Sequence, residues 1–109
     1  MLIYHMSMLE DQRIYEEQAE LCQVFSNANR LIILELLNDG EERTVTQIED
    51  RTDIPQPTIS QHLAVMREKG VVTRRKDGVR SFYSLADDRF KQGMDTMRSV
   101  LLDRMEEVP

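Results

Sequence analysis

The sequence predicts a mainly α-helical fold with a single β-hairpin, in the order α-α-α-α-β-β-α. Three observations support this fold class. Apolar residues recur at helical spacing over much of the chain, a capping motif and two prolines delimit two short central helices, and an Asp-Gly pair separates two β-prone runs. Because 109 residues is a typical length for one domain, we expect residues 1–109 to form a single domain.

A first helix is expected at about residues 9–25, where Ile14 and Leu21 belong to an apolar stripe on an otherwise acidic segment. The following segment, residues 31–37, is apolar on nearly all sides, which is typical of a central buried helix. A Ser-Asn pair before this segment can cap its start, and the helix is expected to stop at Asn38-Asp39-Gly40.

Two shorter helices follow, with a rigid turn between them. Thr44 and Gln47 have the spacing of a capping box, which opens a helix. Residues 53–57 contain two prolines, which fix the backbone and remove hydrogen-bond donors, so a turn is expected there. The helix after this turn is expected at about residues 56–69. Its inward side has the spacing i, i+4, i+7 and consists of Ile59, Leu63 and Met66.

A β-hairpin is expected at residues 71–85, with Asp77-Gly78 at its turn. The last helix is expected at about residues 87–106, because the acidic residues at its start suit a helix N-terminus. Its apolar residues recur at spacings of three and four, and they are Phe90, Met94, Met97, Leu101 and Met105.

This order of elements is typical of a winged helix-turn-helix: a helix, a tight turn, a second helix and a basic hairpin. Because the major groove of DNA admits one α-helix, we expect the helix at 56–69 to read bases there. The hairpin at 71–85, called the wing, is expected to follow phosphates or to enter the minor groove. The candidate DNA-binding residues of the helix are Gln56, Thr58, Ser60, Gln61, His62 and Arg67, and those of the wing are Arg74, Arg75, Lys76 and Arg80. For His62, a packing role is an equally good interpretation.

The net charge of −6 does not favour binding to nucleic acid, but the distribution of charge does. Residues 54–85 contain six basic and two acidic residues, a balance of +4, whereas the rest of the chain carries −10. Arg30 lies outside this basic segment; it can bind a phosphate, but its place beside a buried run favours a structural ion pair. Acidic residues elsewhere are expected to form a solvated face, among them Glu16, Glu17, Glu20, Glu41 and Glu42.

From about residue 21 to residue 85 the chain resembles the arsenic-repressor-like (ArsR) family of winged-helix regulators. The resemblance rests on residues 29–37 (NRLIILELL), 56–63 (QPTISQHL) and 63–72, and on Phe82-Tyr83 in the wing. It implies a homodimer, paired through the first and last helices, that binds double-stranded DNA at an operator and usually represses transcription. Two-fold symmetry then predicts an inverted-repeat operator. The interface candidates on these helices are Ile14, Leu21, Met94, Met97 and Leu101.

The sequence departs from that family in three places. Metal-sensing members carry a Cys-x-Cys in the first helix of the DNA-binding pair, but residues 46–50 contain no cysteine. Other members place Asp and His ligands on the last helix, which here has aspartates and no histidine. Pro55 replaces the serine usual at the cap of the recognition helix. Since His5, His62 and Cys22 lie in unrelated elements, we predict no metal site and no cofactor.

The sequence also bears on functions other than DNA binding. No Gly-rich phosphate loop, Gly-x-Ser-x-Gly or catalytic His-carboxylate pair is present, so we predict that the protein is not an enzyme. Two alternatives stay open: a winged-helix module for protein–protein interaction without DNA binding, and a redox-responsive regulator that uses Cys22. Packing as a small hydrophobe is the other interpretation of Cys22. We expect a cytoplasmic protein with no membrane partner, for three reasons. The chain has a single cysteine, its N-terminal apolar run is short, and no apolar stretch is long enough to span a membrane.

Overall fold

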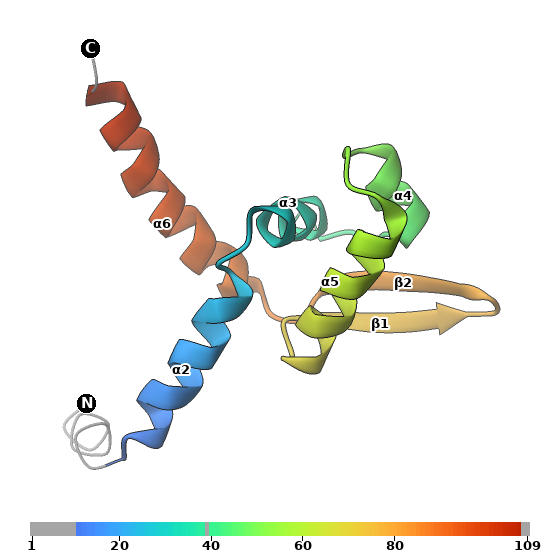
Figure 1. Ribbon diagram of the computed structural model, residues 1–109, viewed down its shortest axis with the longest axis horizontal. Coiled ribbons are helices and arrows are strands. Elements are labelled where there is room, and N and C mark those ends of the chain that lie inside the picture. Colours follow the sequence, from blue (N-terminus) through green and yellow to red (C-terminus); the bar gives the residue numbers. More distant parts are fainter. Residues whose placement is uncertain (1–10, 39, 108–109) are drawn as a thin grey trace.

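The computed structural model describes residues 11–38 and 40–107, and its elements follow the expected order (Figure 1). The helices are α2 (Arg13–Val24), α3 (Ala28–Leu37), α4 (Val45–Asp50), α5 (Gln56–Glu68) and α6 (Asp88–Glu107), and the strands are β1 (Val72–Asp77) and β2 (Arg80–Leu85). The prediction of a mainly α-helical winged helix-turn-helix is confirmed. The expectations that concern residue 9, His5 and Asp39 lie outside the described residues.

Helix α3 is the central helix of the core. The side chain of Asn27 caps it, because its Oδ1 accepts a hydrogen bond from the Arg30 N–H at 3.1 Å. Ile33 and Leu34 are fully buried, as the apolar run predicts, but Ile32 is 46% exposed. The buried apolar residues of the core come from α2, α3, α4, α5, β1 and the segments just before α5 and β1, and they are Val24, Ile33, Leu34, Leu37, Ile48, Ile54, Ile59, Leu63, Met66, Val71 and Val72.

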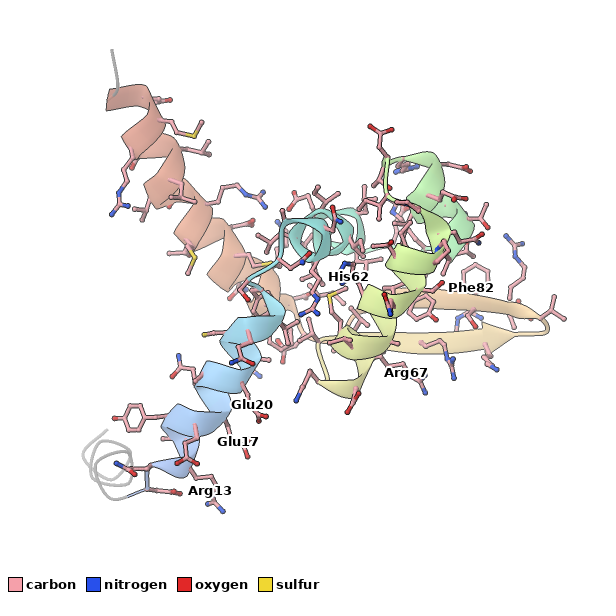
Figure 2. All side chains as sticks on the ribbon, in the orientation of Figure 1. Arg13, Glu17, Glu20, His62, Arg67 and Phe82 are labelled. Atoms are coloured by element: carbon pink, nitrogen blue, oxygen red, sulfur yellow. The ribbon has the colours of Figure 1, made fainter. Side chains whose placement is uncertain are left out.

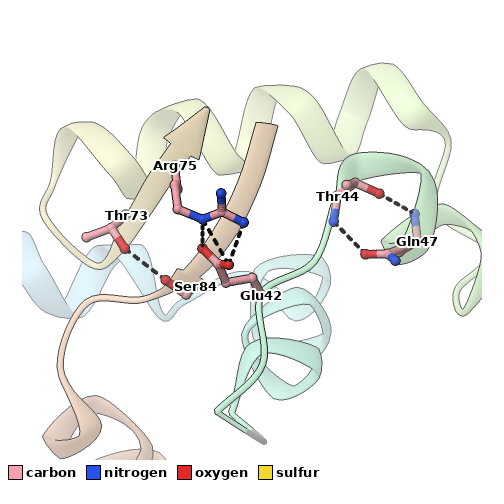
Figure 3. Close-up of polar contacts among 6 residues, drawn as sticks. All are labelled: Glu42, Thr44, Gln47, Thr73, Arg75 and Ser84. Carbon is pink, nitrogen blue, oxygen red and sulfur yellow. Dashed lines mark hydrogen bonds and ion pairs between the residues drawn. The ribbon is translucent and has the colours of Figure 1, made fainter. Parts of the chain in front are cut away.

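The capping box predicted before α4 is formed in both directions (Figure 3). Thr44 Oγ1 accepts a hydrogen bond from the Gln47 N–H at 3.2 Å, and Gln47 Oε1 accepts one from the Thr44 N–H at 2.9 Å. Helix α5 ends one residue before the expected end, with Lys69 as its C-cap. Gly70 follows with φ +77, a backbone conformation that favours glycine, so it closes the helix as the sequence suggests.

The wing is a two-stranded antiparallel hairpin in which Val72 lies opposite Leu85 and Asp77 lies opposite Arg80. The two-residue turn is therefore Gly78-Val79, one residue later than expected. Gly78 has φ +63 and Val79 does not have a positive φ, which is the pattern of a type II′ turn with glycine at its first central position. The prediction of Asp77 as a turn residue is wrong because Asp77 extends the strand pairing by one residue.

A short segment before α4 adds to the wing from the other side. The Arg43 N–H donates to Tyr83 O at 2.9 Å, and the Tyr83 N–H donates to Arg43 O at 2.8 Å. The Arg43 side chain is 6% exposed and its Nε donates to Leu36 O at 2.7 Å. These bonds tie β2 to the end of α3, and the sequence did not predict them.

Helices α2 and α6 diverge from the core as two arms (Figure 1). Near their common base, the rings of Phe25 and Phe90 lie with centroids 5.7 Å apart. Farther out, the arms carry exposed apolar side chains, namely Ile14, Tyr15, Met97, Val100, Leu101, Leu102 and Met105. No helix in the described part of the chain is both long and apolar enough to cross a membrane.

Candidate nucleic-acid interface

Helix α5 is anchored on one side and exposed on the other. Ile59, Leu63 and Met66 have no exposed surface, and they fix the helix against the core. Of the predicted contact residues on α5, Gln56, Ser60, Gln61 and Arg67 are exposed, and Thr58 and His62 are partly buried. The predicted division between inward and outward residues therefore fits the structure at Gln56, Ser60, Gln61 and Arg67.

The start of α5 is capped by a side chain from α4. Pro55 is the N-cap residue and has no side-chain group to accept a hydrogen bond. Instead, Glu49 Oε2 accepts a hydrogen bond from the Gln56 N–H at 3.2 Å. Because a carboxylate also interacts favourably with the positive end of a helix dipole, Glu49 replaces the missing serine cap. The sequence analysis missed this residue, whose only signal was an acid seven positions before the start of α5.

His62 joins α5 to α3. Arg30 Nε donates a hydrogen bond to His62 Nδ1 at 3.1 Å, and both residues are partly buried. Burial lowers the pKa of His62, and the positive charge of Arg30 lowers it further, so the imidazole is neutral at pH 7. Within the described residues, the favoured ion pair of Arg30 is not formed: its side chain bonds to a neutral ring instead.

The two faces of the wing carry different side chains. Since opposed residues of a hairpin share a face, Arg75 and Phe82 lie on one face and Arg74 and Tyr83 on the other. The guanidinium carbons of Arg75 and Arg80 lie 4.7 Å and 5.4 Å from the centroid of the Phe82 ring. Two cations thus flank one aromatic ring on the outer face, a favourable arrangement for a ring quadrupole.

Arg75 also forms an ion pair across the wing with Glu42 (Figure 3). Its Nε lies 3.0 Å and 3.1 Å from the two carboxylate oxygens, and its Nη2 lies 2.9 Å from Oε1. The hydrogen bonds from Arg75 lower the pKa of Glu42, and those to Glu42 raise the pKa of Arg75. Glu42 is exposed, as expected, and it is also an ion-pair partner of the wing.

The basic residues of the interface differ in whether their side chains already have an acidic partner. Within the described residues, no ion pair or hydrogen bond occupies the side chains of Arg67, Arg74 or Lys76, and all three are exposed. The guanidinium of Arg80 lies over the Phe82 ring, and no ion pair within the described residues includes Arg80. Arg75 alone is already paired. The interface therefore presents four cations without an acidic partner around a polar helix face, an arrangement suited to phosphate and base contacts.

The predicted dimer residues lie on the two arms. Ile14, Met97 and Leu101 are 43%, 71% and 51% exposed. Leu21 and Met94 are partly buried against the core of their own chain, so these two serve the fold as well. Cys22 on α2 is an exposed free thiol. Among the residues that the structure describes, no group of three His, Cys, Asp or Glu side chains is arranged to hold a metal ion.

The fold and this interface define a winged helix-turn-helix transcriptional regulator. Residues 27–74 match the family described as bacterial regulatory protein, arsR family. An uncharacterized HTH-type transcriptional regulator of Methanocaldococcus jannaschii is 42% identical over 78 residues, which cover 72% of this chain and 88% of that protein. The chain belongs to the arsR family of bacterial regulatory proteins.

Other relatives carry functional names. The biofilm growth-associated repressor of Agrobacterium fabrum is 34% identical over 77% of this chain and 71% of its own length. The transcriptional activator HlyU of Vibrio cholerae is 33% identical over 79% of each chain. The homodimeric winged helix-turn-helix DNA-binding domain of a possible ArsR-family regulator from Mycobacterium bovis has 26% identity and a TM-score of 0.77, covering 88% of this chain and 90% of that one.

Proposed function

We propose that this protein binds double-stranded DNA as a homodimer and represses transcription, with α5 in the major groove and the wing on the backbone or in the minor groove. The observation that carries the proposal is the exposed polar row Gln56, Ser60 and Gln61 on a helix whose opposite side is fully buried. A rigidly anchored helix can hold such short polar groups against base edges.

The wing and Arg67 supply the phosphate contacts in this proposal. Arg74, Lys76 and Arg80 are exposed cations without an acidic partner in the described part of the chain. Such cations release counterions when they meet phosphates, which gives affinity that depends on salt and not on sequence. The helix then supplies sequence preference, and the wing supplies affinity and register.

The proposed homodimer is supported by the apolar surface of the two arms, α2 and α6. The exposed apolar residues of α2 and α6 need a cover, and the M. bovis structural neighbour is homodimeric. Residues 1–109 then act as one domain of each protomer. Pairing about a two-fold axis would present the two copies of α5 to two successive major grooves on the same side of the duplex. The expected operator is therefore an inverted repeat with half-site centres about 34–36 Å apart.

Repression is the direction that we propose, since a dimer seated on a promoter blocks access to the DNA that it covers. One relative is named a repressor and another an activator, so the direction needs its own test. A reporter gene behind the selected operator should be expressed less when the protein is present, and increased expression would reverse this assignment. The cytoplasm is the site of action in this proposal.

DNA binding is tested by fluorescence anisotropy of labelled duplexes over a salt series. Wild-type affinity should fall steeply with salt, and Arg74→Gln should lower the slope of log affinity against log salt by about 0.9 per lost contact, or about 2 per dimer. Lys69→Gln is the matched control, since Lys69 pairs with Glu20 on α2 and lies outside the wing. If the wild-type protein shows no salt-dependent binding to any duplex, a protein-interaction module takes the place of this function.

A further inference from the structure

Arg30 is a partly buried cation whose charge is not neutralised within the described residues. Its one side-chain hydrogen bond is donated by Nε to His62 Nδ1, at 3.1 Å. None of the ion pairs formed in the described part of the chain includes Arg30. A guanidinium has five N–H donors in a planar fork, so the four on its Nη atoms remain available.

An unneutralised charge of this kind points to a partner from outside the chain. Buried or partly buried charges are usually paired, because leaving water costs a charged group free energy. His62 cannot be that counter-charge, since an imidazole is either neutral or positively charged. Burial and the charge of Arg30 both lower the pKa of His62, which favours the neutral ring. The imidazole therefore orients the guanidinium without neutralising it.

The position of Arg30 indicates what the partner is. His62 follows Gln61 on α5 and lies one helical turn after Thr58, so Arg30 reaches the flank of the recognition helix near its polar row. Figure 2 shows His62 where α5 faces α3. A helix with side chains is about 10–12 Å across and the major groove is about 12 Å wide, so the flanks of a helix in the groove face the phosphates that border it.

We propose that Arg30 binds a backbone phosphate of DNA through its Nη groups and that His62 is the residue that positions it. This proposal rests on the proposed DNA-binding function. It adds a phosphate contact from α3, on the flank of α5, to the contacts that the wing makes. The planar fork of Arg matches two phosphate oxygens at once, so Arg30 both adds affinity and fixes the depth of α5 in the groove.

The first test removes the charge of Arg30. Arg30→Gln keeps a donor for His62 and should lower the slope of log affinity against log salt by about 2 per dimer, on preferred and random duplexes alike. Arg13→Gln is the matched control, because Arg13 is an exposed arginine on α2, far from α5 (Figure 2). It should leave the slope unchanged.

The second test separates positioning from charge. His62→Leu removes the acceptor but keeps the guanidinium, so affinity should fall several-fold while the salt slope stays near that of the wild type. His62→Asn places an amide oxygen close to where Nδ1 was, and it should restore most of the affinity. A purely structural role of the pair would change the melting temperature in both variants without this pattern in binding.

The outcomes distinguish this proposal from the general function. Suppose that wild-type affinity falls steeply with salt, that Arg74→Gln lowers this slope and that Arg30→Gln does not. In that case only the proposed role of Arg30 is overturned. If no wild-type binding occurs, both fail together. If Arg30→Gln does not fold, the NMR resonance of the Arg30 Nε–H in the wild-type protein provides the test. This resonance should shift on saturation with duplex DNA, and an unchanged resonance would overturn the proposal.

Discussion

Arg75 is a basic residue of the wing that is already paired with an acidic side chain of its own chain. Its guanidinium is paired with Glu42 and lies over Phe82, so it stiffens the wing before any DNA is present. Exposed ion pairs contribute at most about 1 kcal/mol, which is comparable to the gain from a new phosphate contact. In the proposed complex, Glu42 would therefore compete with DNA for Arg75.

This competition gives a prediction for Glu42→Gln. Because the variant frees Arg75, affinity for duplex DNA of any sequence should rise up to about fivefold for each subunit of the dimer, the factor that about 1 kcal/mol represents. The slope of affinity against salt should steepen at the same time. Anisotropy titrations measure both quantities. Glu17→Gln makes the same charge change on α2, far from the wing, and an equal rise in that control would mean that net charge alone is responsible (Figure 2).

Gln61 represents the opposite case, because its side chain forms no hydrogen bond with any other residue that the structure describes. It is exposed near the middle of α5, where an amide can pair with a base edge. Gln61→Ala should cost roughly 1–3 kcal/mol per contacted base pair on the preferred site and little on random DNA. Competition titrations against random duplex give this ratio. Gln92→Ala on α6 should leave it unchanged; equal losses on both kinds of DNA would assign Gln61 to the backbone.

At the scale of elements, the predictable parts are those with local signals. The capping box at Thr44 and Gln47, the double proline before α5 and the glycine after it each act within a few residues, and each gave a correct boundary within about a residue. The hairpin turn was misplaced by one residue because the Asp-Gly signal does not decide whether Asp77 is paired. Strand register settles that, and register depends on both strands.

The parts that the sequence did not predict all join residues far apart in the chain. Arg43 pairs with Tyr83, Glu42 with Arg75, and Arg30 with His62. None of these pairs has a periodicity or a short motif, because each depends on how two elements pack. The outward residues of α5 were predictable from helical spacing, whereas the groups that orient α5 and the wing were not.

The cap that Glu49 provides for α5 leads to an element-scale prediction. Glu49→Ala removes the acceptor for the Gln56 N–H and should lower the free energy of unfolding by about 1 kcal/mol, typical for loss of an N-cap. Thermal unfolding would show this as a fall of several degrees in Tm. Asp50→Ala removes an acid next to Glu49 that is exposed and caps nothing at α5, so an equal fall there would argue against capping.

At the scale of the whole molecule, the proposed dimer forms through the arms. Met97 is 71% exposed on the apolar stripe of α6, where a second copy is expected to pack. Wild-type protein should sediment with twice the chain mass of 12.8 kDa, and Met97→Glu should lower this value because it buries a charge in the seam. Gln92→Glu, off the stripe, should remain dimeric. A wild-type monomer at micromolar concentration would contradict the proposed dimer.

The separation of the arms from the reading elements has a genetic consequence. Residues 45–85 hold the recognition helix and the wing, whereas the arms come from the two ends of the described chain. In the proposed dimer, a subunit with an inactivated recognition helix keeps an intact pairing surface. It would sequester normal subunits in half-functional pairs, so such alleles should be dominant over the wild type. Alleles that damage α6 should instead be recessive, since their products cannot reach a partner to interfere with it.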